Sequence, residues 1–146
     1  MSHVKLLALD LDGTLLDSEG GISEKNTIAI RAAEAQGVLV TIATGRRFRD
    51  ARPLAIEAQL NAPILTHNGA LIKIAASLET VHFDLLKRDV ILDILEVGES
   101  LGGDALVSSD PHGKGKLLYE TISGENIPLK RYVEWAKRLH GDEASE

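Results

Sequence analysis

Two aspartates, Asp10 and Asp12, stand one residue apart at the end of an apolar run in LLALDLDGTLLDSEG, residues 6 to 20. Side chains alternate along a strand, so both carboxylates point broadly the same way while Leu11 turns to the core. Two ionised carboxylates ~4 Å apart repel by about 4 kcal/mol at an effective dielectric of 20. Mg²⁺ offsets such repulsion, because it binds one or two carboxylates and fills its shell with water and phosphate. The pair therefore predicts a site for a divalent metal ion.

The residues around this pair suit the same chemistry. Asp10, nearest the strand end, can act as a nucleophile or metal ligand, and Asp12 is available for proton transfer. Gly13 lets the backbone turn sharply, and Thr14 adds a hydroxyl and an amide beyond the strand. A lone aspartate here would more often be a helix cap or a solvated strand end, but the paired spacing favours a site.

A second polar stretch follows a later apolar run. Thr44 offers a hydrogen-bond donor, Gly45 permits close approach of a ligand, and the amides that follow point at an anion. The Arg46 guanidinium can donate two parallel hydrogen bonds to a phosphate or a carboxylate. We expect the neighbouring arginines to lie on a solvated face: Arg47, Arg49 and Arg52.

The elements that must position these residues alternate between strand and helix. In chain order they are a strand over Val4–Leu9, a helix from the N-cap Ser23 to Gln36, a strand over Val38–Ala43, a helix starting near Asp50, and a strand over Pro63–Thr66. The first strand is nearly continuous in apolar residues, which predicts burial on both faces. Pro53 would lie in the first turn of the second helix, where no helical hydrogen bond is lost. This order predicts parallel strands, and ligands bind beyond their carboxyl ends.

The second half of the chain follows another pattern. The expected elements are strands over Leu71–Ile74 and Val81–Leu85, a helix over Val90–Leu101, strands over Ala105–Val107 and Leu117–Thr121, and a helix from Pro128 to Gly141. The predicted fold class is α/β, with a three-layer doubly wound parallel sheet over 1–84 and a smaller α+β unit over 85–146.

Composition excludes several classes of protein. The chain has 146 residues and a net charge of −6, with 22 acidic residues against 16 Lys and Arg, which argues against nucleic-acid binding. The absence of cysteine excludes disulfides and thiolate metal sites. No apolar run approaches the ~18–20 residues of a membrane span, and the N-terminus lacks the layout of a secretory signal. We therefore expect a cytoplasmic protein.

The stretch DLDGT after an apolar strand resembles the first motif of the haloacid dehalogenase (HAD) superfamily, whose phosphatases pass through an aspartyl-phosphate. The resemblance implies that Asp10 attacks phosphorus. It implies that Asp12 protonates the leaving oxygen and later activates water. Mg²⁺ would then be held by the Asp10 side chain and the Asp12 carbonyl, so both residues are expected metal ligands.

Two further stretches carry the resemblance. The stretch IATGR, residues 42 to 46, is similar to the second motif, in which Thr44 binds the transferring phosphoryl group. THNGALI, residues 66 to 72, resembles the third strand end of the Cof-like branch, which carries an α/β (type IIB) cap. Asn68 and Gly69 would lie near the pocket between core and cap. The branch implies a phosphatase of sugar phosphates or similar small phosphorylated metabolites.

The sequence departs from the family pattern in one respect. The family also uses a lysine and a late acidic motif, both placed after the cap, and neither is found here. The chain therefore looks like an N-terminal portion, and we expect weak or absent activity from it alone. The first strand would also keep an unpaired apolar edge, which predicts a dimer, a domain-swapped assembly or poor solubility.

Two alternatives stay open. A truncated, non-catalytic relative could bind a phosphorylated ligand or a partner chain. A receiver-like phosphoacceptor domain has similar length and topology, but it needs its acceptor aspartate at the end of the third strand. This chain has Thr66, His67 and Asn68 there.

Overall fold

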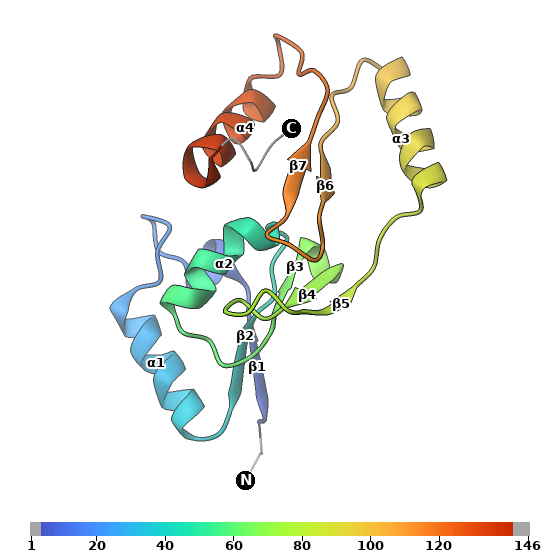
Figure 1. The fold of residues 1–146 in the computed structure, drawn as a ribbon. Helices are drawn as coiled ribbons and strands as arrows, with labels where there is room; N and C mark the ends of the chain where they lie inside the picture. The colour runs from blue at the N-terminus through green and yellow to red at the C-terminus, as the bar shows by residue number, and fades with distance from the viewer. Residues whose placement is uncertain (1–3, 142–146) are drawn as a thin grey trace. The chain divides into compact units, whose positions relative to one another are not determined.

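Parallel strands joined by helices build the first part of the fold. β1 (Leu6–Leu9) pairs in parallel register with β2 (Leu39–Ile42). A parallel bridge between Ala43 and Leu65 continues the pairing to β3 (Ile64–Thr66). The connections are α1 (Glu24–Ala35) and α2 (Phe48–Glu57), as Figure 1 shows. The computed structural model describes residues 4–141, and within them the predicted alternation of strands and helices is confirmed.

An antiparallel extension follows β3. A short turn, η2 (His67–Gly69), leads into β4 (Leu71–Lys73), which pairs with β3 on one side and β5 (Thr80–Phe83) on the other. Both strands were predicted, with ends that differ by one or two residues. The chain divides into two units between Asp84 and Leu85.

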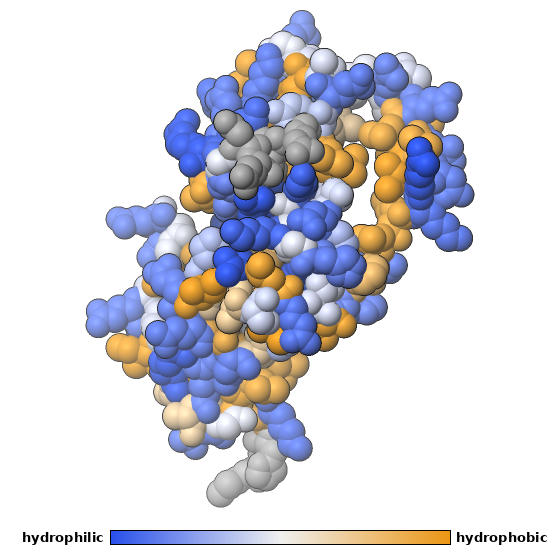
Figure 2. Space-filling model, in the orientation of Figure 1, coloured by the Kyte–Doolittle hydropathy of each residue, from blue (hydrophilic) through white to orange (hydrophobic). Residues whose placement is uncertain are grey.

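The second unit contains α3 (Arg88–Ser100), the antiparallel hairpin of β6 (Val107–Ser109) and β7 (Lys116–Leu118), and α4 (Ile127–His140). The Asn126 side chain caps α4 by accepting a hydrogen bond from Leu129 N. No residue of α3 is buried, and Figure 2 shows apolar surface along this helix. Among the described residues, no helix is long and apolar enough to cross a membrane.

One apolar core holds the first unit together. It joins the two helices to the strands and to the turn after β1, and its buried members are Leu11, Leu15, Ile30, Val40, Ile42, Phe48, Ala51, Ala55, Ile64 and Leu71. Because both α1 and α2 contribute to this one cluster, the positions of the strand ends depend on it.

The prediction that the first strand is buried on both faces is wrong for the described chain. Leu6 is 56% exposed and its register partner Leu39 is 49% exposed. Leu9 alone in β1 is partly buried, because it packs against the core. β1 is the end strand of its sheet, so one of its edges has no paired strand among residues 4–141.

The second helix also begins earlier than predicted. α2 starts at Phe48, so Pro53 is its sixth residue and lies beyond the first turn. The first turn of α2 holds a buried ion pair, in which Arg47 Nε and Nη2 donate to the two carboxylate oxygens of Asp50, at 2.9 and 3.1 Å. The expectation that Arg47 is solvated is therefore wrong. Arg52 Nε likewise donates to Ala75 O at 2.7 Å.

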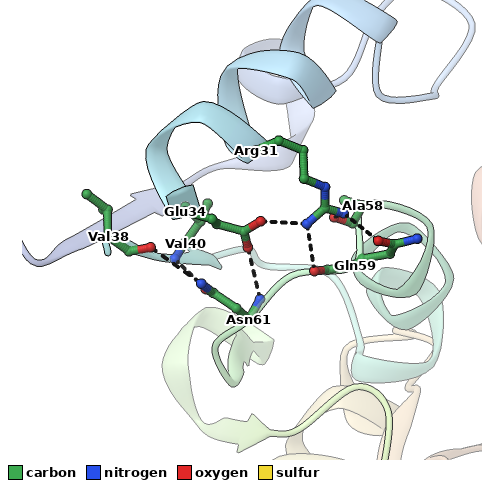
Figure 3. A network of polar contacts seen from close by, with 7 residues as sticks. All are labelled: Arg31, Glu34, Val38, Val40, Ala58, Gln59 and Asn61. Carbon is green, nitrogen blue, oxygen red and sulfur yellow. Dashed lines mark hydrogen bonds and ion pairs between the residues drawn. The ribbon is translucent and has the colours of Figure 1, made fainter. Parts of the chain in front are cut away.

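A polar network ties the loop after α2 to α1 and β2 (Figure 3). Arg31 donates to Glu34 and to the carbonyl oxygens of Ala58 and Gln59. Asn61 N donates to Glu34 at 3.2 Å, and Asn61 Oδ1 accepts from Val40 N at 2.9 Å. Asn61 thus satisfies an amide of β2 that β1 does not reach.

Replacing Asn61 with alanine is expected to lower the free energy of unfolding by about 1–2 kcal/mol. The reason is that the amide of buried Val40 would lose its acceptor. Urea unfolding of the two proteins measures the difference. Asn61→Asp, which keeps the acceptor oxygen, is the matched control and should cost less; equal losses in both variants would contradict this assignment.

Candidate active site

The turn after β1 is shaped by its own sequence. Leu15 N donates to Asp10 O at 3.2 Å and Leu16 N to Leu11 O at 3.0 Å, which closes one wide turn, η1 (Leu11–Leu15). Gly13 has φ +76°, a conformation that other residues rarely adopt. The two flanking leucines of η1 are buried and the polar residues between them are exposed. The apolar ends therefore anchor a turn that presents Asp12, Gly13 and Thr14 to solvent.

The two aspartates have different partners. Asp10 Oδ2 accepts a long hydrogen bond of 3.4 Å from the Thr14 hydroxyl. Asp12 receives both arms of Arg46, with Nε donating to Oδ2 at 2.9 Å and Nη2 to Oδ1 at 2.5 Å. Arg46 follows β2, so this ion pair joins the ends of two neighbouring strands. Of the two acceptors foreseen for Arg46, phosphate and carboxylate, it binds the carboxylate here.

The ion pair favours the ionised form of Asp12. The hydrogen bonds from Arg46 lower the pKa of Asp12 below its ordinary value, against a small opposing effect of burial. The same hydrogen bonds raise the pKa of Arg46. Asp12 is therefore ionised at neutral pH in the free protein, a form that can accept a proton but not donate one.

Thr44 connects the second strand end to the third. It is buried, and its hydroxyl accepts from Arg46 N at 3.2 Å while its own amide donates to Leu65 O at 3.0 Å. Asn68 N donates to Thr44 O at 3.2 Å, and His67 N donates to Arg46 O at 2.9 Å. The loops after β2 and β3 are thus held together through their backbones.

Asn68 packs directly on Gly45. A side chain at position 45 would place its Cβ 2.9 Å from Asn68 Oδ1, so the asparagine side chain would have to shift to make room for it. Asn68 has φ +57° and Gly69 has φ +94°, which turns the chain sharply between β3 and β4. The pair of predicted residues, Asn68 and Gly69, therefore lies next to the loop after β2.

The hydrogen bonds link most of the predicted site residues. Asp12, Arg46, Thr44 and Asn68 form one connected chain of contacts, and Asp10 and Thr14 form a second pair at the end of β1. Their roles in binding or catalysis stay predictions.

The burial of three charged residues near this region escaped sequence reasoning. Besides the Arg47 and Asp50 pair, Lys73 is 0% exposed, and its Nζ lies 5.0 Å from the centroid of the Phe48 ring. A signal existed for each. Arg47 and Asp50 have the i, i+3 spacing of an ion pair across one helix turn. Leu71 and Lys73 stand at i and i+2 in β4, so both side chains point to the same, core-facing side of the strand.

His67 makes the first unit sensitive to acid. Burial lowers the pKa of His67 below its ordinary 6.5, Arg47 lowers it further, and Asp50 opposes them. Because the unfolded chain then binds more protons than the folded one below about pH 6.5, stability falls as the pH falls.

We expect the free energy of unfolding to drop between about pH 7.5 and about pH 5.5, and to drop less in His67→Asn. Asparagine is the matched replacement because it tolerates the positive φ of 53° at this position. Urea unfolding at the two pH values measures both slopes. Identical pH slopes in wild type and variant would contradict the role given to His67.

The acidic pair suits a loosely held metal ion. Asp10 and Asp12 offer oxygen ligands, and among residues 4–141 no three His, Asp or Glu side chains gather closely enough to form a fuller cage. Mg²⁺ fits such a set because it commonly binds one or two carboxylates and takes its other ligands from water and phosphate.

Parallel strands with an acidic turn and an arginine at adjacent carboxyl ends define an α/β protein, a class whose ligands bind beyond the strand ends. The family model of haloacid dehalogenase-like hydrolases matches residues 7–142. The chain belongs to this family.

Similar curated proteins and solved structures agree with this family assignment. One relative is a 5-amino-6-(5-phospho-D-ribitylamino)uracil phosphatase, YcsE of Bacillus subtilis, and the two proteins are 48% identical over 69 residues. The matched residues make up 47% of this chain and 28% of that protein. A haloacid dehalogenase-like hydrolase from Bacteroides thetaiotaomicron superposes with a TM-score of 0.71 at 27% identity, over 98% of this chain and 51% of that one. A sugar phosphatase of HAD subclass IIB superposes with a TM-score of 0.65 at 22% identity, over 97% of this chain and 49% of that one.

These matches confirm the predicted fold class and the resemblance to Cof-like HAD phosphatases. The chain spans about half the length of the solved structures that it matches.

Proposed function

We propose that this chain is part of a Mg²⁺-dependent phosphatase that hydrolyses phosphate monoesters through a phosphorylated Asp10. The carrying observation is the acidic turn after β1, which meets Arg46 from the end of β2. Membership of a hydrolase family, and relatives named as phosphatases, support this class of reaction.

In the first step, Asp12 must carry a proton, which it takes up from solvent or keeps from the previous cycle. A carboxylate oxygen of Asp10 attacks phosphorus, the bond to the ester oxygen breaks, and Asp12 gives that oxygen its proton. In the second step, Asp12 takes a proton from water, the water oxygen attacks phosphorus, and the bond to Asp10 breaks to release phosphate. In the free protein Asp12 is ionised and paired with Arg46, and this is the form that accepts the proton in the second step.

The remaining residues bind rather than react. The Thr44 hydroxyl and the amides of the two neighbouring loops would donate to the phosphoryl oxygens. Mg²⁺, held by the Asp10 side chain and the Asp12 carbonyl, would neutralise the charge on those oxygens. Asn68 and Gly69 would border the leaving group.

We propose small phosphorylated metabolites, such as sugar or polyol phosphates, as substrates. Two similar proteins support this class, one named a phosphatase of a phosphoribityl compound and one a sugar phosphatase. We expect the isolated chain to be a weak enzyme, because no third acidic group joins Asp10 and Asp12 among the described residues.

The test is release of phosphate from p-nitrophenyl phosphate by the 146-residue chain at high protein concentration, with Mg²⁺ or with a chelator. We expect slow release that stops on chelation. Release that ignores the chelator would contradict the proposal, and so would absence of both release and Mg²⁺-dependent binding of a phosphate mimic.

A non-catalytic binding module is the second candidate. It is favoured because the chain covers only part of the length of the relatives that it matches. Such a module would bind inorganic phosphate with Mg²⁺ and would release none from any ester. Asp10→Asn separates the two, because an enzyme would lose its turnover, whereas a binder would have no turnover to lose.

A further inference from the structure

Two consecutive arginines at the start of α2 have opposite environments. Arg46 is partly exposed and donates to Asp12, whereas the side chain of Arg47 is buried and donates to both carboxylate oxygens of Asp50. Arg47 is 8% exposed and Asp50 is 6% exposed. Burying a guanidinium is costly unless a carboxylate pairs with it, so Asp50 makes the buried position of Arg47 possible.

The buried pair lies directly beside the loop that carries Arg46. Arg47 is the N-cap residue of α2, and its carbonyl oxygen accepts from Asp50 N at 3.1 Å. The carbonyl oxygen of Arg46 accepts from His67 N at 2.9 Å. The backbone that carries the Arg46 side chain is therefore fixed on one side by the loop after β3 and on the other by the buried pair.

The charge of Asp50 also acts on Arg46. The pKa of Arg46 is raised mainly by its hydrogen bonds to Asp12, and the negative charge of Asp50 raises it further. The charge of Asp50 likewise opposes the lowering of the His67 pKa that burial and Arg47 produce. Asp50 thus interacts with charged groups of both loops, the one after β2 and the one after β3.

We propose that Asp50 is a positioning residue for the proposed phosphate site. Arg46 and Arg47 both have the chemistry to bind the Asp12 carboxylate. By holding Arg47 in the core, Asp50 fixes the loop after β2 so that Arg46 is the arginine that faces Asp12. The effect on phosphate rests on the proposed function, whereas the position of Arg46 can be measured without it.

The direct test is the exchange of the Arg46 Nε–H with solvent, followed by heteronuclear NMR of the whole chain. Asp50→Asn keeps the size and one acceptor oxygen of the side chain but removes its charge. The Arg46 Nε–H should then exchange at least about fivefold faster, the change expected for the loss of a typical hydrogen bond. Arg47→Lys keeps the cation but cannot donate two parallel hydrogen bonds, so it should show a change in the same direction. This second variant carries the test if circular dichroism shows that Asp50→Asn does not fold.

The matched control is Glu34→Gln in α1. Arg31 and Glu34 form an ion pair with the same i, i+3 spacing, in the same unit of the chain. This variant also removes a carboxylate charge from a helix ion pair, and urea unfolding measures the stability that it loses. The Arg46 Nε–H should nevertheless exchange as it does in wild type, because Glu34 contacts Arg31 and Asn61 rather than the loop after β2.

A double-mutant cycle extends the test to the ligand. Isothermal titration calorimetry measures the affinity for inorganic phosphate in the presence of Mg²⁺. Asp50→Asn should weaken phosphate binding by about threefold or more, and it should have no further effect when Arg46 is already alanine. A side chain that only stabilised the fold would have the same effect in both backgrounds.

Three results would overturn the proposal. They are wild-type exchange of the Arg46 Nε–H in both Asp50→Asn and Arg47→Lys, equally accelerated exchange in Glu34→Gln, and an equal loss of phosphate affinity from Asp50→Asn with and without Arg46. If wild type binds no phosphate, the proposed function fails, and the exchange measurement still decides the role of Asp50.

Discussion

Replacing Asp10 with asparagine should lower phosphatase turnover by a factor on the order of a thousand or more. The amide has the size and shape of the carboxylate, but it lacks the negatively charged oxygen that attacks phosphorus. It also removes one of the two expected ligands of Mg²⁺. The measurement is the rate of phosphate release per chain, with wild type and variant at equal concentration.

Asp93→Asn is the matched control, because Asp93 is exposed on α3 and undergoes the same chemical change. Its turnover should equal that of wild type. Peptide mapping after an acid quench adds a second readout, since a trapped phosphoryl group should appear on the peptide with Asp10 and be absent in the variant. Retention of more than about a tenth of the wild-type rate by Asp10→Asn would rule out this nucleophile.

Replacing Phe48 with alanine should lower the free energy of unfolding by about 3–5 kcal/mol. Phe48 is 1% exposed at the start of α2, and it belongs to the core that joins both helices to the strands. Its loss leaves a cavity and takes away the ring beside the buried Lys73. This loss is a large share of the 5–15 kcal/mol that stabilises an ordinary domain.

Urea unfolding measures the change, and Phe48→Leu separates its two causes. Leucine keeps most of the apolar volume but offers no ring to the Lys73 ammonium. A small loss for leucine with a large loss for alanine would assign the effect to packing. A loss below about 1 kcal/mol for alanine would contradict the central place given to Phe48.

The local features of the site could be predicted from sequence because neighbouring residues determine them. The wide turn after β1 follows from its spacing of buried leucines around a glycine, and Gly13 does adopt positive φ. Ser23 was expected to cap the first helix, and its hydroxyl accepts from Asn26 N at 3.2 Å. The alternation of strands and helices was likewise predictable, since it reflects hydrophobic periodicity along continuous segments.

Features that depend on distant segments could not be predicted in the same way. Arg47 and Arg49 both look like surface residues in the sequence, yet Arg47 is buried beside Asp50. Lys73 is buried although lysine is usually solvated. β1 reads as a strand covered on both faces, yet Leu6 is exposed, because cover depends on which other segments pack against a strand.

The sequence by itself determined where the chemistry-bearing residues stand, at the ends of three apolar strands, because strand ends and turns are encoded by adjacent residues. Only the tertiary structure decided that Arg46 binds Asp12, that Asn68 packs on Gly45, and that Arg47 is buried beside Asp50. Each of these depends on two segments meeting in space, and a side chain has several partners of suitable chemistry until the fold selects one.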